Sequence, residues 1–110
     1  MARENPDLET VVIGVGNQKG GVGKTTMTVQ IACALVERGR KVLIIDLDVN
    51  AGATKHFGIK PEGFLGTFEM LVGDEEPLDV VLTNDDEDNS LPENLHLIPG
   101  GRKLESLEER

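Results

Sequence analysis

Short apolar runs alternate with polar and glycine-rich segments in the first half of the chain. Residues 10–16 are rich in β-branched apolar side chains, which is typical of a strand buried on both faces, as in a parallel sheet. Residues 17–23 are rich in glycine, so the strand is not expected to continue through them. The sequence from Lys24 to Arg38 is long enough for a helix of about four turns, and Gly39 is the kind of residue that ends one.

A second apolar run at 41–46 completes a strand–helix–strand unit. The two strands of such a unit are parallel, and the crossover is right-handed in nearly all cases. The pattern therefore predicts an α/β fold, with a mainly parallel sheet and helices on both faces.

Beyond Asp48 the periodic signal weakens. Residues 48–63 are interpreted as a loop, because glycine and proline recur there. Residues 84–94 have the composition of a solvated acidic loop. The other elements are expected to be short: a helix at 67–71 stopped by Gly73, strands at 80–82 and 95–98, and a helix at 103–109.

Charge is distributed unevenly between the two halves. The 110 residues carry 20 acidic against 11 basic side chains, a formal net charge of −9. Residues 1–60 have 8 bases and 6 acids, whereas residues 61–101 have 11 acids and neither lysine nor arginine. The overall charge argues against non-specific binding to DNA or anionic lipid. The slightly basic first part can still hold a phosphate ligand.

Other totals indicate a cytoplasmic protein. Cys33 is the only cysteine, so an internal disulfide is excluded and a reducing compartment is expected. No apolar run approaches the roughly 20 residues that span a bilayer. The polar first residues lack the apolar stretch of a secretion signal.

The segment from Gly16 to Thr26 carries the candidate chemistry. It follows a predicted strand and opens a predicted helix, which is the context that a phosphate-binding loop requires. Its glycines allow the backbone to approach a ligand, and successive N–H groups at a helix N-terminus form an anion site. Lys24 supplies a mobile positive charge for phosphates, and the Thr25 hydroxyl can ligate Mg²⁺. ATP or ADP with Mg²⁺ is the expected ligand.

The strict P-loop pattern fails at Gln18, which stands where a first glycine is expected. The loop instead resembles the deviant Walker A loop of the ParA/MinD family of ATPases, which also includes nitrogenase iron protein. The resemblance implies a P-loop NTPase fold. The residues that it assigns to the nucleotide are Lys19, Gly20, Gly21, Val22, Gly23, Lys24, Thr25 and Thr26.

Two carboxylates, Asp46 and Asp48, end the second apolar run. Taken alone, they are either solvated acids or a Walker B strand whose aspartate orients Mg²⁺. The resemblance implies a different assignment, in which Asp46 lies near the Mg²⁺ shell with Thr25 and Asp48 positions or activates the attacking water. Ala53-Thr54 matches the ParA pattern after the second aspartate, whereas residues 49–52 depart from it. ParA is therefore the closer branch.

The resemblance also gives Lys19 a role. In this family the corresponding lysine reaches across a dimer interface to the nucleotide of the other subunit, as an arginine finger does. Lys19, Lys24 and Asp48 are thus the implied catalytic residues, and hydrolysis is expected to depend on a homodimer formed through the nucleotide site.

The resemblance covers residues 11–108, specifically in the first half and more weakly afterwards. We expect residues 1–110 to be the N-terminal part of a longer ParA-type domain, with the nucleotide core at 10–48 and the switch region and following elements at 49–110. Family members carry the Walker B strand, the adenine pocket and the DNA-binding surface in a later half, so DNA binding cannot be read from this chain.

The implied function is ATP hydrolysis in DNA partitioning or cargo positioning, with a ParB-like or adaptor protein as activator. Two alternatives remain open. One is a MinD-like ATPase associated with the membrane, which would need a C-terminal amphipathic helix that this sequence lacks, so membrane binding is not expected. The other is a nucleotide-binding or dimerisation module that does not hydrolyse ATP.

Overall fold

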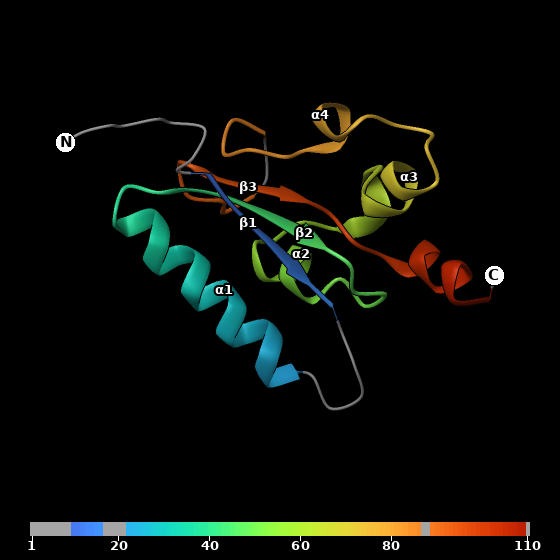
Figure 1. The fold of residues 1–110 in the computed structure, drawn as a ribbon, viewed down its shortest axis with the longest axis horizontal. Helices are drawn as coiled ribbons and strands as arrows, with labels where there is room; N and C mark the ends of the chain where they lie inside the picture. The colour runs from blue at the N-terminus through green and yellow to red at the C-terminus, as the bar shows by residue number, and fades with distance from the viewer. Residues whose placement is uncertain (1–9, 17–21, 87–88, 110) are drawn as a thin grey trace.

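The computed structural model describes residues 10–16, 22–86 and 89–109 (Figure 1). Its three strands form one parallel sheet in the order β1-β2-β3. They are β1 (Thr10–Val15), β2 (Lys41–Asp46) and β3 (Leu95–Ile98). The structure thus confirms the α/β fold with a parallel sheet and the expected strand at 95–98.

The hydrophobic core lies on one face of this sheet. Alternate residues of the paired strands share a face, and the register sets Ile13 beside Ile44, which in turn lies beside Leu97. Helix α1 (Val22–Glu37) covers this face with the buried side chains of Val29 and Ala32. The core is completed from α2 and the segments around it by Ala53, Phe57, Ile59, Leu82 and Leu91.

Helix α1 confirms the predicted helix with small shifts at both ends. It begins two residues before Lys24 and ends at Glu37. Gly39 has φ 87°, and its N–H donates a hydrogen bond to the Val36 carbonyl at 2.9 Å. This left-handed glycine closes the last turn, as the sequence predicted.

The predicted loop at 48–63 is wrong, because it contains helix α2 (Gly52–His56) and the 3₁₀ helix η2 (Pro61–Gly63). Helix α2 begins at this point because of two features that local composition does not reveal. Asp48 accepts hydrogen bonds from the N–H of Asn50, just before the helix, and from the N–H of Gly52, its first residue. Ala51 adopts a left-handed conformation with φ 56°.

The predicted strand at 80–82 is also wrong. Helix α4 (Pro77–Val80) occupies its start, since proline is pre-organised for the first turn of a helix. Only Leu82 pairs with the sheet, through a single antiparallel bridge to Leu97 in which the two backbones exchange hydrogen bonds of 2.7 and 3.0 Å.

The remaining elements lie beyond the carboxyl end of β3 or beside it. Helix α3 (Thr67–Leu71) is followed by Gly73 at φ 87°, which confirms the expected helix and its stop. The segment expected to be helical at 103–109 is the 3₁₀ helix η3 (Arg102–Glu109). Figure 1 shows α3 and η3 at the same end of the molecule, and their residues are in contact.

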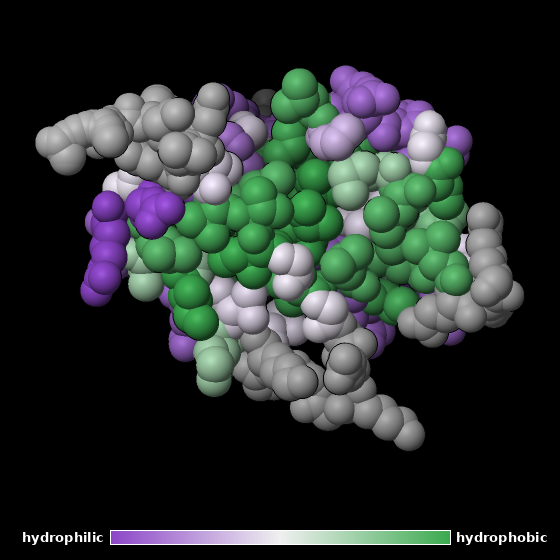
Figure 2. Space-filling view, in the orientation of Figure 1, coloured by the Kyte–Doolittle hydropathy of each residue, from purple (hydrophilic) through white to green (hydrophobic). Residues whose placement is uncertain are grey.

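The side of the sheet opposite the core is covered less completely. Val12 on β1 points to that side and is 58% exposed. Met27 and Ile31 are also exposed, at 61% and 51%, but they lie on α1, the helix that covers the core face. Figure 2 shows hydrophobic residues gathered across the centre of this view, over the region of β1 and β2. Among the described residues, no helix combines the length and apolar character needed to cross a membrane.

Candidate functional site

The candidate site lies where β1 and β2 end and α1 begins. Loops that follow parallel strands meet at the carboxyl edge of a sheet, where ligands of α/β proteins bind. Lys19, Gly20 and Gly21 lie outside the described residues. The backbone from Val22 to Thr25 forms the first turn of α1, and the first four N–H groups of a helix have no partner within it. The side chains of residues 22–24 also lie outside the description.

The Asp46 carboxylate is fully buried at the end of β2 and is held by protein donors. Its Oδ1 accepts the Asp48 N–H at 3.0 Å. Its Oδ2 accepts the Thr54 N–H at 2.9 Å and the Thr54 hydroxyl at 2.6 Å. Burial raises the pKa of Asp46 above its ordinary value, and the nearby Asp48 charge adds to this, while the hydrogen bonds from Thr54 and Asp48 oppose the rise.

The Asp48 carboxylate holds the start of α2. Its Oδ1 accepts the Asn50 N–H and its Oδ2 accepts the Gly52 N–H, both at 2.9 Å. The bond from Gly52, the first residue of α2, satisfies a backbone donor that the first turn of a helix leaves unpaired. Asp46 and Asp48 together therefore fix the path of residues 48–54, which the sequence interpretation assigns to the switch region.

Gly52 lets Asp48 and Thr25 approach each other across it. A β-carbon at position 52 would lie 3.1 Å from Asp48 Oδ2, 3.1 Å from Thr25 Cγ2 and 3.6 Å from Thr25 Oγ1. The first turn of α1 and the carboxylate of Asp48, two residues after β2, are thus brought together. Asp46 instead faces Thr54, so its expected place near Mg²⁺ stays a prediction.

The donor set fits a Mg²⁺ ion that arrives with a nucleotide. The described residues contain no group of three or more His, Cys, Asp or Glu side chains that could hold a metal. Mg²⁺, however, is usually bound by one or two protein oxygens together with water and substrate phosphates. The Thr25 hydroxyl and the carboxylates at the end of β2 are oxygen donors of this kind.

Comparison with known proteins identifies the family. A family model described as an AAA domain matches residues 10–110. The chain belongs to the ParA/MinD family of P-loop ATPases.

Three relatives illustrate the similarity. The sporulation initiation inhibitor protein Soj of Bacillus subtilis is 35% identical over 98 residues, which are 88% of this chain and 36% of that protein. The chromosome-partitioning ATPase Soj of Thermus thermophilus is 43% identical over 67 residues, 61% of this chain and 25% of the relative. The chromosome partitioning protein ParA of Myxococcus xanthus is 41% identical over 64 residues, 57% of this chain and 23% of the relative.

This ParA/MinD-family chain therefore spans about a third or less of the length of the relatives it matches. No solved structure matches it significantly.

Two residues of the ParA/MinD-type site were assigned no role by the sequence interpretation. Thr54 was noted only as part of a family pattern, yet its hydroxyl bonds to Asp46. Gly100 lies in the turn after β3, where its N–H donates to Thr54 Oγ1 at 3.1 Å. A β-carbon at Gly100 would lie 2.8 Å from the Asp48 carbonyl oxygen and 2.9 Å from Asp46 Cγ. The signal available for this position was a Pro-Gly-Gly turn directly after a strand.

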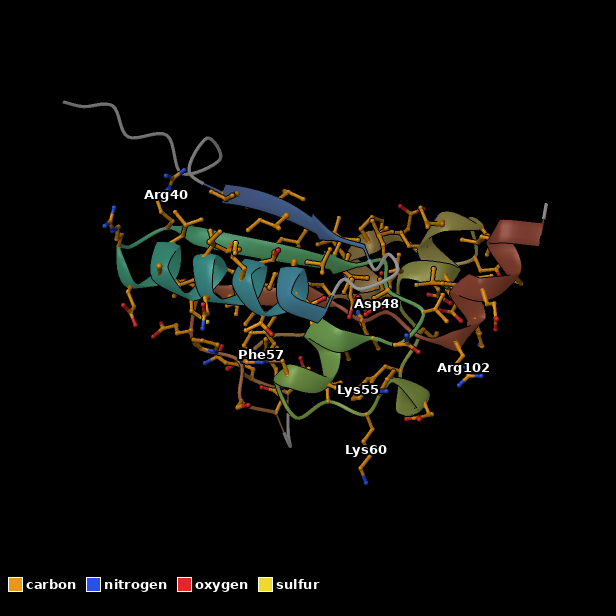
Figure 3. All side chains as sticks on the ribbon, turned by 90° about the horizontal axis from the view of Figure 1, so that it is seen from below. Arg40, Asp48, Lys55, Phe57, Lys60 and Arg102 are labelled. Carbon is orange, nitrogen blue, oxygen red and sulfur yellow. The ribbon has the colours of Figure 1, made fainter. Side chains whose placement is uncertain are left out.

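A pocket of about 350 Å³ opens beside the switch region. Its walls come from the segment after Asp48, from α3 and from the turn after β3, and none of the described residues of α1 lines it. Figure 3 shows Asp48 at the end of β2, with Lys55 and Arg102 at the same end of the molecule. The pocket walls include Asn50, Lys55, Phe64, Phe68 and Arg102.

A buried carboxylate, Glu69, links α3 to η3 on the far side of this pocket. Glu69 is 7% exposed; its Oε1 accepts the Gly66 N–H at 2.7 Å, and its Oε2 pairs with Lys103 Nζ at 2.9 Å. Burial alone would raise the pKa of Glu69. The hydrogen bond and charge of Lys103, with the backbone N–H groups of Gly66 and Glu69, outweigh burial and lower the pKa below its ordinary value of 4.5.

We expect Glu69 to stabilise the fold at neutral pH and to lose this effect in acid. Because the folded pKa lies below the unfolded one, the stabilisation is complete above about pH 5 and is lost as the pH falls through the folded pKa. Glu69→Gln should therefore cost about 1–2 kcal/mol at pH 7 and less at pH 3. Urea denaturation followed by circular dichroism at both pH values tests this. Glu62→Gln, an exposed acid on η2, is the control, and an equal effect of Glu69→Gln at both pH values would contradict the prediction.

Proposed function

We propose that the chain binds ATP with Mg²⁺ at the N-terminus of α1 and hydrolyses it in a homodimer that forms on nucleotide binding. The observation that carries the proposal is the meeting of Thr25 and Asp48 across Gly52. A P-loop threonine and a carboxylate that can orient water have to face the same phosphates, and this geometry is consistent with that requirement. Membership of the ParA/MinD family supports the same reaction.

Each site residue has a distinct proposed role. The backbone N–H groups of residues 20–26 and the Lys24 ammonium hold the phosphates, and Lys19 stabilises the transferring phosphoryl group in the partner subunit. Thr25 and Asp46 would hold Mg²⁺, which when bound neutralises phosphate charge. Asp48 orients the attacking water, and its bonds to Asn50 and Gly52 keep its carboxylate fixed in preparation for that task.

The proposed cellular role is DNA partitioning or cargo positioning in the cytoplasm. It is supported by the names of two relatives, a chromosome-partitioning ATPase and a chromosome partitioning protein. A ParB-like or adaptor protein would activate hydrolysis. Contact with non-specific DNA would involve regions that the longer relatives have beyond the matched part.

Lys19→Ala tests the dimer-dependent mechanism. We expect this variant to bind a fluorescent ATP analogue within about threefold of the unmodified chain, because the lysine acts on the partner's nucleotide. It should lose the ATP-dependent rise in mass measured by light scattering. Lys60→Ala, an exposed lysine after α2, should change neither measurement. Normal ATP-dependent dimers of Lys19→Ala would refute the proposed role.

Phosphate release distinguishes the remaining alternatives. It is measured with and without Mg²⁺ and DNA, on the 110-residue chain and on the protein as its gene encodes it. Release that requires Mg²⁺ supports the ATPase. Nucleotide binding without release in either sample would favour a module that binds nucleotide and does not hydrolyse it.

A further inference from the structure

We propose that the Thr54 hydroxyl is a positioning group for the Asp48 carboxylate and that it acts through Asp46 and Gly100. This inference rests on the proposed ATPase function, in which Asp48 orients water. The Thr54 hydroxyl bonds to Asp46 and to the Gly100 N–H. Its effect would come from fixing the loop that carries Asp48.

Three hydrogen bonds to Asp46 close the loop that carries Asp48. Asp46 accepts the N–H of Asp48 on one oxygen and the N–H and hydroxyl of Thr54 on the other. One buried carboxylate therefore ties together both ends of the segment 48–54. The Asp48 side chain, bonded to Asn50 and Gly52 inside that segment, moves with it.

The bond from the Thr54 hydroxyl to Asp46 is short and shielded from water. Its hydroxyl lies 2.6 Å from Asp46 Oδ2, which is the short distance of a hydrogen bond to an ionised acceptor. Thr54 is fully buried, so water cannot replace the hydroxyl without a rearrangement. The Thr54 hydroxyl oxygen also accepts the Gly100 N–H at 3.1 Å. One hydroxyl group thus serves both as donor to the β2 carboxylate and as acceptor for the turn after β3.

The turn after β3 fits tightly against this loop. The space at Gly100 is too small for a β-carbon, because backbone atoms of Asp46 and Asp48 lie against it. The turn after β3 therefore presses on the same two residues that the carboxylate bonds hold. Loss of the hydroxyl would leave the Gly100 N–H without its acceptor and would free the turn and the loop to separate.

Thr54→Val removes the hydroxyl at nearly constant volume, and Thr54→Ser restores it. In the protein as its gene encodes it, we expect Thr54→Val to lower kcat for ATP at least about tenfold with KM within about twofold, because phosphate binding is preserved while the water-orienting group is misplaced. Thr54→Ser should stay within about threefold of the unmodified protein. Thr67→Val is the matched control: Thr67 is also fully buried, and its hydroxyl makes only a 3.4 Å bond to the Ile98 carbonyl.

Amide hydrogen exchange followed by NMR tests the same link without nucleotide. Thr54→Val should lose protection at the amides of Gly100 and Asp48 by at least about tenfold, while the β2 amide of Ile44 keeps its protection. If Thr54→Val does not fold by circular dichroism, Thr54→Ala replaces it, since it removes the hydroxyl without adding a methyl group.

The two measurements separate the two proposals. A protein that neither binds nor hydrolyses ATP overturns the proposed function, and the exchange pattern then decides the positioning of Asp48 alone. If the unmodified protein hydrolyses ATP and Thr54→Val retains its kcat, the inference is overturned while the proposed function stands. Equal exchange in Thr54→Val and the unmodified protein, or equal losses in Thr67→Val, would also overturn it.

Discussion

Replacing Gly66 with alanine is expected to prevent stable folding. Gly66 lies directly before α3, and a β-carbon there would collide with the Pro99 carbonyl oxygen, with the Pro99 carbonyl carbon at 3.0 Å and the ring Cγ at 3.1 Å. The glycine has φ −158°, which lies outside the left-handed region that favours glycine, so the obstacle is the lack of space.

The Pro99 backbone cannot move away without cost. Its carbonyl accepts the Thr67 N–H at 2.8 Å, and Pro99 itself is fully buried. Gly66→Ala therefore has to break the bond that joins α3 to the turn after β3, or displace the helix that Glu69 caps. We expect a loss of more than about 4 kcal/mol, which is a large share of the roughly 5–15 kcal/mol that stabilises a small domain.

Urea denaturation of Gly66→Ala and Gly63→Ala measures this effect. Gly63 is exposed in η2, and a β-carbon there meets nothing within 4 Å. Its substitution should change the free energy of unfolding by less than about 0.5 kcal/mol. Native-like stability of Gly66→Ala would show that the turn after β3 yields more easily than its hydrogen bonds imply.

The elements that could be predicted from the sequence are those whose stability depends on local patterns. β1, β2 and β3 are short apolar runs, and α1 lies between a glycine-rich loop and a terminating glycine. The missed elements depend on distant or unusual contacts. Helix α2 has five residues, too few to form from intrinsic propensity, and it begins because the Asp48 side chain bonds to its first turn.

The candidate site divides in the same way. Its sequence motif predicted Thr25, Asp46 and Asp48 as site residues, and the structure brings Thr25 and Asp48 together. The bond between Gly100 and Thr54 joins residues 46 positions apart. No periodicity or spacing encodes such a contact, because it depends on how the parallel strands place their following loops at one edge. The contact that ties Thr54 to the turn after β3 could therefore be found only in three dimensions.

Replacing Asp48 with asparagine is expected to remove most ATP hydrolysis while nucleotide binding persists. The substitution keeps the shape of the side chain and removes its charge, which the proposed mechanism uses to orient and activate water. A general base or water-orienting group typically contributes 10²–10⁴-fold to the rate, so we expect kcat to fall at least about 100-fold. The affinity for ATP should change less than about threefold, because the phosphates are held by the P-loop.

Asp48 also has a structural role, which the experiment has to separate. The asparagine amide group cannot accept the second of the two N–H groups that now bond to the carboxylate. We therefore expect a loss of about 1–2 kcal/mol in the free energy of unfolding, measured by urea denaturation alongside phosphate release. Asn50→Ala serves as a control in the same turn, since it keeps the backbone N–H that Asp48 binds and changes only an exposed side chain. The Asp48→Asn protein is expected to remain folded. A 100-fold loss of kcat in this variant, and not in Asn50→Ala, would therefore identify the carboxylate charge as the catalytic requirement. Hydrolysis at the unmodified rate would assign Asp48 to the cap of α2 only.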